Sequence, residues 1–329
     1  MVRIIVDKQI PFIKEAVQKE WPQVEICPME SEEIVPSAIQ EADVLIVRTR
    51  TRINEQLLAD SKVQLVCTAT IGFDHIDTDY CEAHHIRWMS CPGCNAQAVC
   101  DYIEEALNTI SHFPFSIFHS SPTIGIVGVG HVGSLVAKMA ERHGLNVLLN
   151  DPPKGIGKSI DEIARNSDII TFHVPLDKST YHMCDEAFLS MCKPDALIIN
   201  AARGGVVDEK ALLRSGHPYI LDTWENEPDI DNDVLAHAQL ASMHIAGYSI
   251  EGKRNASQMC LDEIAETFNL KPIDISKYRY LDLSTSRDLE VPKEKGDSAP
   301  GWISRITSQL KAHPTAFEAL RKAYPLRAR

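Results

Sequence analysis

Three polar residues suited to hydride transfer, Arg203, Glu227 and His244, each follow a short apolar run that is typical of a strand. A guanidinium holds a carboxylate through two parallel hydrogen bonds and polarises an adjacent oxygen. Histidine takes a hydroxyl proton readily near neutral pH, and a carboxylate beside the ring orients it and stabilises its charged form. Taken singly, each residue is more often structural or a surface charge. Their joint placement after strands favours oxidation of a 2-hydroxy acid.

A glycine-rich turn precedes these residues in the chain. Gly128-x-Gly130-x-x-Gly133 follows an apolar run that starts at Thr123, and a helix-like segment comes after it. The first glycine permits a tight turn, the second lets a pyrophosphate approach the backbone, and the third lets the helix pack against the sheet. Asp151 ends the next strand, where a carboxylate accepts hydrogen bonds from ribose hydroxyls and repels a 2′-phosphate. A purely structural turn is the alternative, but strand, helix and Asp151 together predict NAD binding.

Two blocks of alternating strands and helices must position these residues. Such alternation is typical of βαβ units and parallel sheets, in which the residues that follow each strand share one edge. In the first block we expect strands at Val2–Asp7, Val24–Cys27, Val44–Val47, Leu65–Ala69 and Arg87–Ser90. In the second block we expect strands from Thr123 and at Val147–Leu149, Ile169–Phe172, Ala196–Ile199, Tyr219–Leu221 and Leu240–Ser242. The expected helices include Ile13–Lys19, Asn54–Ala59, Asn95–Ile110, Asn255–Phe268 and Ala316–Ala323.

The predicted fold class is therefore α/β, with two Rossmann- or flavodoxin-like domains, parallel sheets, a cleft between the domains and a short carboxy-terminal extension. Residues 1–95 and 255–269 are expected to form a substrate-binding domain, and residues 96–254 are expected to form the NAD-binding domain. Residues 270–329 form the expected extension. Its first part, up to Trp302, is polar and predicts loops.

The composition limits the classes of function. The chain has 329 residues and a formal net charge of −13, which disfavours binding to nucleic acid. No apolar run approaches the roughly 20 residues that cross a bilayer, and the first residues do not resemble a signal peptide, so we expect a cytoplasmic protein without membrane contact. Cys91 and Cys94 form the only CxxC motif. A structural role is favoured over a redox or metal role because no second ligand pair accompanies them, and no metal site is expected.

Several strings of residues are shared with a known enzyme family. The general strings are Val127–Gly130, Asn200–Gly204, Trp224–Pro228 and His244–Gly247, and the more specific ones are Pro92–Ala96 and Ala246–Lys253. They resemble the D-isomer-specific 2-hydroxyacid dehydrogenases over about residues 1–268 of this chain. That family usually has Thr-Pro before the histidine, where this chain has Ser242-Met243.

The resemblance implies NAD-dependent oxidation of a phosphorylated 2-hydroxy acid by a homodimer. It implies that Arg203 binds the substrate carboxylate, that Glu227 supports the base and that His244 is the acid/base. Substrate contacts are implied for Thr49, Thr70 and Tyr248. Cofactor contacts are implied for His131 and Val132 at the pyrophosphate, Asp151 at the ribose, and Val174, Ala201, Asp222 and Gly247 elsewhere. The resembling proteins end in a compact dimerisation domain, which residues 270–329 are expected to match poorly.

Three arginines, Arg48, Arg50 and Arg52, occupy every second position around Thr49 and Thr51. In an extended segment, Arg48, Arg50 and Arg52 would share one face, where their charges could meet a phosphate. We predict that Arg48 helps to bind it. The alternative is an ordinary solvated charged edge.

Two other functions fit the same residues. Another D-2-hydroxyacid dehydrogenase, acting on phosphoglycerate or glyoxylate, would share the motifs. A noncatalytic NAD(H)-sensing protein would share the fold, since fold does not determine function. The presence of all three catalytic residues argues against the sensor.

Overall fold

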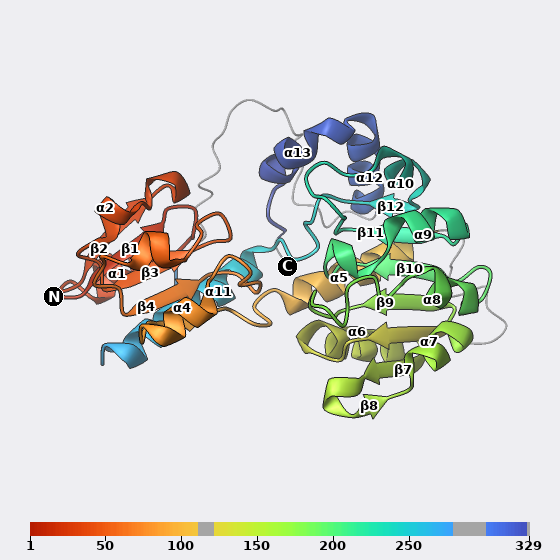
Figure 1. Cartoon of the computed structure of the whole chain (residues 1–329), viewed down its shortest axis with the longest axis horizontal. Helices are drawn as coiled ribbons and strands as arrows, with labels where there is room; N and C mark the ends of the chain where they lie inside the picture. Colours follow the sequence, from red (N-terminus) through yellow and green to blue (C-terminus); the bar gives the residue numbers. More distant parts are fainter. Residues whose placement is uncertain (111–121, 279–300, 328–329) are drawn as a thin grey trace. The chain divides into compact units, whose positions relative to one another are not determined.

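The computed structural model describes residues 1–110, 122–278 and 301–327, which divide into two compact units. The first unit holds residues 1–95 and 249–278, and the second unit holds residues 96–110, 122–248 and 301–327. Each unit is an α/β fold built on its own sheet (Figure 1). Within these ranges, no helix is both long enough and apolar enough to cross a membrane.

A five-stranded parallel sheet with the order β2-β1-β3-β4-β5 forms the first unit. Its strands are β1 Arg3–Asp7, β2 Glu25–Met29, β3 Val44–Val47, β4 Leu65–Thr68 and β5 Arg87–Met89. Its helices are α1 Ile13–Glu20, α2 Pro36–Ile39, α3 Glu55–Leu58, α4 Thr78–Ala83 and α11 Ile250–Thr267, with the 3₁₀ turn η1 Ser31–Glu33. Alternate residues of a strand point to opposite faces. Ile4 and Val6 therefore pack with α1 and α11, whereas Ile5 packs with α2 and α3.

Seven strands form the sheet of the second unit, in the order β12-β11-β10-β9-β6-β7-β8. They are β6 Thr123–Val127, β7 Asn146–Asp151, β8 Ile156–Gly157, β9 Ile169–Phe172, β10 Leu197–Asn200, β11 Tyr219–Leu221 and β12 Leu240–Ala241. The helices are α5 Ala96–Thr109, α6 His131–Arg142, α7 Ile160–Asn166, α8 Glu186–Met191, α9 Glu209–Ser215, α10 Asn232–His237, α12 Trp302–Ala312 and α13 Phe317–Ala323. The 3₁₀ turns are η2 Pro152–Lys154, η3 Gly204–Val206 and η4 Pro314–Ala316. The sheet is parallel as predicted, except that the short edge strand β8 runs antiparallel to β7.

The chain returns to the first unit earlier than the sequence indicated. Helix α11 begins at Ile250, and the Ser249 hydroxyl caps it by accepting a hydrogen bond from the Gly252 N–H. The expected start at Asn255 was wrong, because a glycine and two charged residues in the first turn hide the helical spacing of apolar residues. Residues 249–254 therefore belong to the first unit.

Residues 301–327 are an integral part of the second unit, so the expected separate extension was wrong. Helix α12 packs on β12 and α5, and the Thr307 hydroxyl bonds to both the N–H and the carbonyl of Ala241. The core of the unit includes Trp302, Ile303, Ile306, Leu310 and Phe317 from this segment. Of the remaining residues of that expected extension, 270–278 lie in the first unit, while 279–300 and 328–329 lie outside the described residues.

Candidate active site

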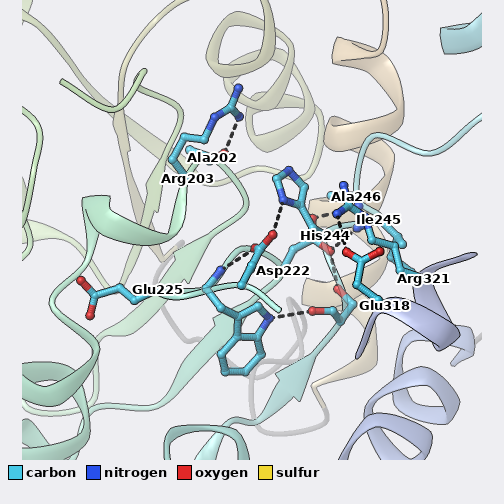
Figure 2. A network of polar contacts seen from close by, with 12 residues as sticks. Ala202, Arg203, Asp222, Glu225, His244, Ile245, Ala246, Glu318 and Arg321 are labelled. Carbon is cyan, nitrogen blue, oxygen red and sulfur yellow. Dashed lines mark hydrogen bonds and ion pairs between the residues drawn. The ribbon is translucent and has the colours of Figure 1, made fainter. Parts of the chain in front are cut away.

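The three predicted catalytic residues lie at one edge of the second sheet. Strands β10, β11 and β12 are parallel neighbours, and Arg203, Glu227 and His244 follow them in turn. The carboxyl ends of parallel strands meet at one edge, which is where open α/β sheets bind ligands. Figure 2 shows Arg203 and His244 on the loops beyond these strands.

Glu227 and His244 form a hydrogen-bonded pair. Nδ1 of His244 lies 2.9 Å from Oε2 of Glu227, and Oε1 of Glu227 accepts a bond of 2.9 Å from the Trp224 N–H. Burial raises the pKa of Glu227, but the His244 bond and charge, the Trp224 N–H and the Arg321 charge together bring it below its ordinary value. Because an ionised carboxylate only accepts hydrogen bonds, the neutral form of the ring would carry its proton on Nδ1 and its lone pair on Nε2.

Asp222 fixes the loop that carries His244. The Asp222 side chain is buried; its Oδ1 accepts bonds from the Ser242 hydroxyl at 2.6 Å and the Ile245 N–H at 2.8 Å, and its Oδ2 accepts a bond from the Ala246 N–H at 2.9 Å. His244 has a φ of 57°, a left-handed conformation that costs a non-glycine residue about 1–2 kcal/mol. The three bonds to Asp222 support this loop. A cofactor contact was predicted for Asp222, and in this structure both of its carboxylate oxygens are engaged by the protein.

Arg203 lies on a tight loop that Asn200 holds. The Asn200 amide donates to the Arg203 carbonyl at 2.8 Å and accepts from the Ala202 N–H at 3.0 Å. Nη1 of Arg203 donates to the Ala202 carbonyl at 2.8 Å, and the half-buried guanidinium has further N–H groups for a ligand. A Cβ on Gly204 would lie 1.9 Å from the Trp224 carbonyl oxygen. The Arg203 loop therefore lies against the loop that carries Glu227.

The glycine-rich turn fits the pyrophosphate of NAD. Gly128 has a φ of +89°, and a Cβ there would lie 2.5 Å from the His173 carbonyl oxygen. A Cβ on Gly133 would lie 1.9 Å from the Gly128 carbonyl oxygen, so α6 packs directly on the turn. Gly130 differs, because nothing lies within 4 Å of its Cβ position and it caps α6 without a side-chain hydrogen bond. Open space beside free N–H groups at a helix N-terminus suits a phosphate.

Asp151 lies beside the same turn, at the end of β7. Its Oδ2 accepts a bond of 2.9 Å from the Val129 N–H, and the Lys154 ammonium lies 3.6 Å from that oxygen. A carboxylate in this place fits a ribose. The other residues predicted to contact the cofactor are distributed along this edge: His131 and Val132 open α6, Val174 lies beside Gly128, Ala201 follows β10, and Gly247 ends the His244 loop.

Substrate residues predicted in the first unit follow β3 and β4. Thr49 is exposed in a turn, which is closed by a hydrogen bond of 3.2 Å from the Thr51 N–H to the Arg48 carbonyl. The expectation that Arg48, Arg50 and Arg52 share one face of an extended segment was wrong. β3 ends before Arg48 and the chain turns, so the alternation of a strand does not apply.

Arg48 is paired with a buried aspartate. Its Nε lies 2.9 Å from Oδ2 of Asp7, which is fully buried and also accepts a bond of 2.6 Å from the Ser31 hydroxyl. A buried carboxylate needs such partners, so one role of Arg48 is to balance the charge of Asp7. The Thr70 hydroxyl lies 2.7 Å from that of Thr68, on the neighbouring strand β4.

Cys91 and Cys94 are buried in the core of the first unit. Sγ of Cys91 lies 3.8 Å from Sγ of Cys260, and all nine cysteines of the chain are free. Burial raises the pKa of Cys94 to about 12, which keeps it a thiol. Over the described ranges, no group of three potential metal ligands comes together.

Comparison with known proteins identifies the family. The model of the D-isomer specific 2-hydroxyacid dehydrogenase NAD binding domain matches residues 112–246. The chain is 40% identical over 346 residues to the erythronate-4-phosphate dehydrogenase of Bacteroides thetaiotaomicron, covering 99% of this chain and 97% of the relative. It is 37% identical to that of Porphyromonas gingivalis, covering 98% and 92%. The chain belongs to this family, among the erythronate-4-phosphate dehydrogenases. The alignments with these two relatives extend into residues 270–329, whereas those with the relatives of Cronobacter sakazakii and Klebsiella pneumoniae cover 80% and 77% of this chain.

Solved structures show the same family fold. The NAD⁺-bound 3-phosphoglycerate dehydrogenase of Entamoeba histolytica aligns with a TM-score of 0.69 at 26% identity, covering 82% of this chain and 95% of that one. The D-lactate dehydrogenase of Aquifex aeolicus, complexed with NAD and lactic acid, aligns with a TM-score of 0.65 at 24% identity, covering 81% and 95%. The chain is thus an NAD-dependent oxidoreductase with two Rossmann-like α/β units, as the motifs predicted.

Several supporting residues of this dehydrogenase site were not predicted. Asn200 directly follows the apolar run of β10, so its position was a usable signal. The Ser242 hydroxyl donates to Asp222 at 2.6 Å. Nε of Arg321 donates to the Tyr248 hydroxyl at 3.0 Å across 73 residues of sequence, and no local pattern predicts a contact over that separation.

Proposed function

We propose that the chain oxidises 4-phospho-D-erythronate to (R)-3-hydroxy-2-oxo-4-phosphooxybutanoate with NAD, a step in pyridoxal 5′-phosphate biosynthesis. Relatives that share about two-fifths of its residues over nearly its whole length carry the name of this activity. The hydrogen bond between His244 and Glu227, at the strand edge that also holds Arg203 and the glycine turn, is the observation that carries the proposal.

The residues of this site divide the reaction between them. The Arg203 guanidinium binds the substrate carboxylate through paired hydrogen bonds and polarises the C2 oxygen. Nε2 of His244 accepts the proton of the C2 hydroxyl, and Glu227 stabilises the imidazolium that forms. When bound, NAD supplies the ring that accepts the hydride from C2, so that the C2–O bond becomes a carbonyl.

The remaining substrate contacts are proposed for Thr49, Thr70 and Tyr248, with Arg48 near the phosphate. Replacing Arg48 by alanine would leave Asp7 buried without its counter-charge, so lysine is the better test. We expect Arg48→Lys to raise the KM for the phosphorylated substrate more than that for D-erythronate, because lysine keeps the charge but loses the planar fork. An unchanged ratio of the two KM values would exclude Arg48 as a phosphate ligand.

A homodimer in the cytoplasm is the proposed state of the protein. Support comes from the family resemblance and from the nine free cysteines, which suit a reducing compartment. Light scattering of the purified protein measures its mass directly, and a monomer at micromolar concentration would exclude the dimer.

Turnover by the purified protein tests the proposed reaction. NADH formation is followed with NAD and 4-phospho-D-erythronate, D-erythronate, 3-phospho-D-glycerate, D-glycerate and D-lactate in parallel. Where NADH stays bound, a 2-oxo acid is added to reoxidise it, and turnover is measured instead as formation of the oxidised substrate by mass spectrometry. The highest kcat/KM is expected for 4-phospho-D-erythronate. A higher kcat/KM for 3-phospho-D-glycerate than for 4-phospho-D-erythronate would show that the proposed substrate is wrong. Binding of NADH without turnover of any hydroxy acid would contradict the proposal that the chain is catalytic.

A further inference from the structure

Arg327, close to the end of the chain, donates hydrogen bonds to the backbone just after His244. Its Nε lies 3.1 Å from the Tyr248 carbonyl oxygen, and its Nη2 lies 3.3 Å from that of Ile245 and bonds to that of Ala246. One side chain therefore spans the segment that joins the histidine loop to Tyr248.

Residues 245 and 246 are held from both sides. The Asp222 carboxylate accepts hydrogen bonds from the N–H groups of Ile245 and Ala246, at 2.8 and 2.9 Å. The Arg327 guanidinium donates to the carbonyls of the same two residues. An anion thus binds the N–H groups, and a cation binds the carbonyls, of two consecutive residues. Hydrogen bonds in which one group is charged are roughly twice as strong as bonds between neutral groups.

Arg327 also reaches the point where the chain enters the second unit. Its Nη2 lies 3.3 Å from the Ala98 carbonyl oxygen, in the first turn of α5. The chain passes from the first unit to the second between residues 95 and 96, and returns between residues 248 and 249. Within the second unit, Arg327 therefore bonds both to the segment by which the chain enters this unit, at Ala98, and to the segment by which it leaves, at Tyr248.

The guanidinium is held in place by an aromatic ring. It lies 4.9 Å from the centre of the Trp302 ring, at the start of α12. Trp302 is buried, and its ring packs edge-on against that of Tyr102 at 5.9 Å. The Tyr102 hydroxyl in turn bonds to Ser242, which bonds to Asp222. The Arg327 guanidinium and the Asp222 carboxylate, which hold the backbone after His244, are thus both linked to the buried pair Trp302 and Tyr102.

We propose that Arg327 is a positioning residue for hydride transfer, which holds the backbone of residues 245–248 so that the His244 imidazole meets the substrate hydroxyl. The inference rests on the proposed function, in which His244 is the base. His244 adopts a left-handed backbone conformation, so its ring direction depends on the peptide units that follow it. A displacement of about 1 Å at a reacting group costs on the order of 100-fold in rate.

Three variants of the full chain test this role. Arg327→Gln removes the charge, Arg327→Lys keeps the charge without the fork, and Lys322→Gln removes a charge from an exposed residue on the neighbouring helix α13. For each variant we measure kcat, KM, the Kd for NADH, the deuterium isotope effect with substrate labelled at C2, and the melting temperature. Arg327→Ala with added guanidinium ion, below denaturing concentration, gives a rescue experiment.

The expected result is a loss of kcat of about 10- to 100-fold in Arg327→Gln, with the NADH Kd within about twofold of wild type. The isotope effect should rise because hydride transfer becomes slower than the other steps. The kcat of Arg327→Lys should lie between those of wild type and Arg327→Gln. Added guanidinium should restore part of the kcat of Arg327→Ala, and the kcat of Lys322→Gln should equal that of wild type.

Two outcomes separate the inference from the function on which it rests. An active wild type with Arg327→Gln and Arg327→Lys equally active would overturn the positioning role and leave the proposed function intact. A loss of kcat that only follows the loss of folded protein, with an unchanged isotope effect, would also overturn it. A wild type that oxidises no hydroxy acid would contradict the proposed function, and the inference with it.

Discussion

Three histidine–carboxylate pairs lie in the described part of the second unit, His143–Glu104, His182–Glu225 and His244–Glu227, and the proposed mechanism assigns the substrate proton to the last of them. Glu225 and Glu227 are two residues apart, but Glu225 bonds to Nε2 of His182 at 2.5 Å, whereas Glu227 bonds to Nδ1 of His244 at 2.9 Å. Figure 2 shows Glu225 directed away from His244. The His182 ring also lies 3.9 Å from Asp208, so carboxylates face both of its nitrogens, while Nε2 of His244 has no such partner among the described residues.

This difference predicts opposite results for two substitutions of the same type. His244→Gln should lower kcat by about 10²- to 10⁴-fold, because the hydroxyl proton loses its acceptor. His182→Gln should leave kcat within about twofold. Steady-state oxidation measures kcat, and fluorescence titration with NADH checks that both variants bind the cofactor. Equal loss of turnover and of NADH affinity in His244→Gln would contradict the role of His244 as the base.

A buried glutamate beside the site gives a prediction about pH. Oε1 of Glu209 accepts a bond of 2.7 Å from the Glu225 N–H, and Glu209 is only 3% exposed. Burial raises the pKa of Glu209 to about 8, helped by the charges of Glu225, Asp231 and Glu227 and opposed by the Glu225 N–H. Between pH 4.5, near the pKa of an unfolded glutamate, and about pH 8, the folded chain binds one more proton than the unfolded chain. Its free energy of unfolding therefore falls as pH rises through this window.

Glu209→Gln removes that dependence, because glutamine keeps an acceptor for the Glu225 N–H and does not ionise. The melting temperature of the variant should rise relative to wild type as pH increases from about 5 to about 8, since each pH unit costs the wild type up to about 1.4 kcal/mol. Glu186→Gln, an exposed glutamate at the start of α8, is the matched control and should show no such trend. A parallel pH dependence in Glu209→Gln and wild type would show that Glu209 is ionised in the folded chain.

At the scale of elements, strands were more predictable than helices. Strands such as β3 and β9 are buried on both faces and show as continuous apolar runs, so their positions were predicted to within a residue. Helices such as α2, with four residues, are too short for a helical period to show. The turn at Arg48 was missed because an arginine alternation looks the same in a strand and in a turn. The pairing of Glu227 with His244 was predictable because each follows a neighbouring strand.

The glycine turn predicts that two similar substitutions have different effects. Gly130→Ala places a methyl group in open space, so the melting temperature should hold while NADH affinity falls by about tenfold or more, because the methyl takes the place of the phosphate. Gly133→Ala drives a Cβ to 1.9 Å from the Gly128 carbonyl oxygen, so the free energy of unfolding should fall by about 1–3 kcal/mol. Thermal melts and NADH titrations of both variants measure this. An unchanged NADH affinity in Gly130→Ala would show that the pyrophosphate does not bind at this turn.

At the scale of the whole molecule, the last described segment, residues 301–327, contacts the residues that follow His244. Residues 301–327 pack on β12 and α5 and supply Arg321 and Arg327, which donate to the hydroxyl and the carbonyl of Tyr248. The sequence did not predict this, because a polar stretch separates the segment from the rest of the unit and the contacts span more than 70 residues. The cores of the two units share no residue among those described.

Separate cores predict two unfolding transitions that respond to different changes. Leu310→Ala, in the core of the second unit, and Leu261→Ala, in α11 of the first, each remove a fully buried side chain. Each substitution should lower the free energy of unfolding of its own unit by about 2–5 kcal/mol and leave the transition of the other unit unchanged. NADH binds the second unit, so NADH at about 100 times its Kd should raise by about 2.7 kcal/mol the transition that Leu310→Ala lowers. Scanning calorimetry with and without NADH resolves the two. A single transition that both substitutions lower equally would show that the units unfold together, and that the first unit contributes directly to the stability of the NADH-bound protein.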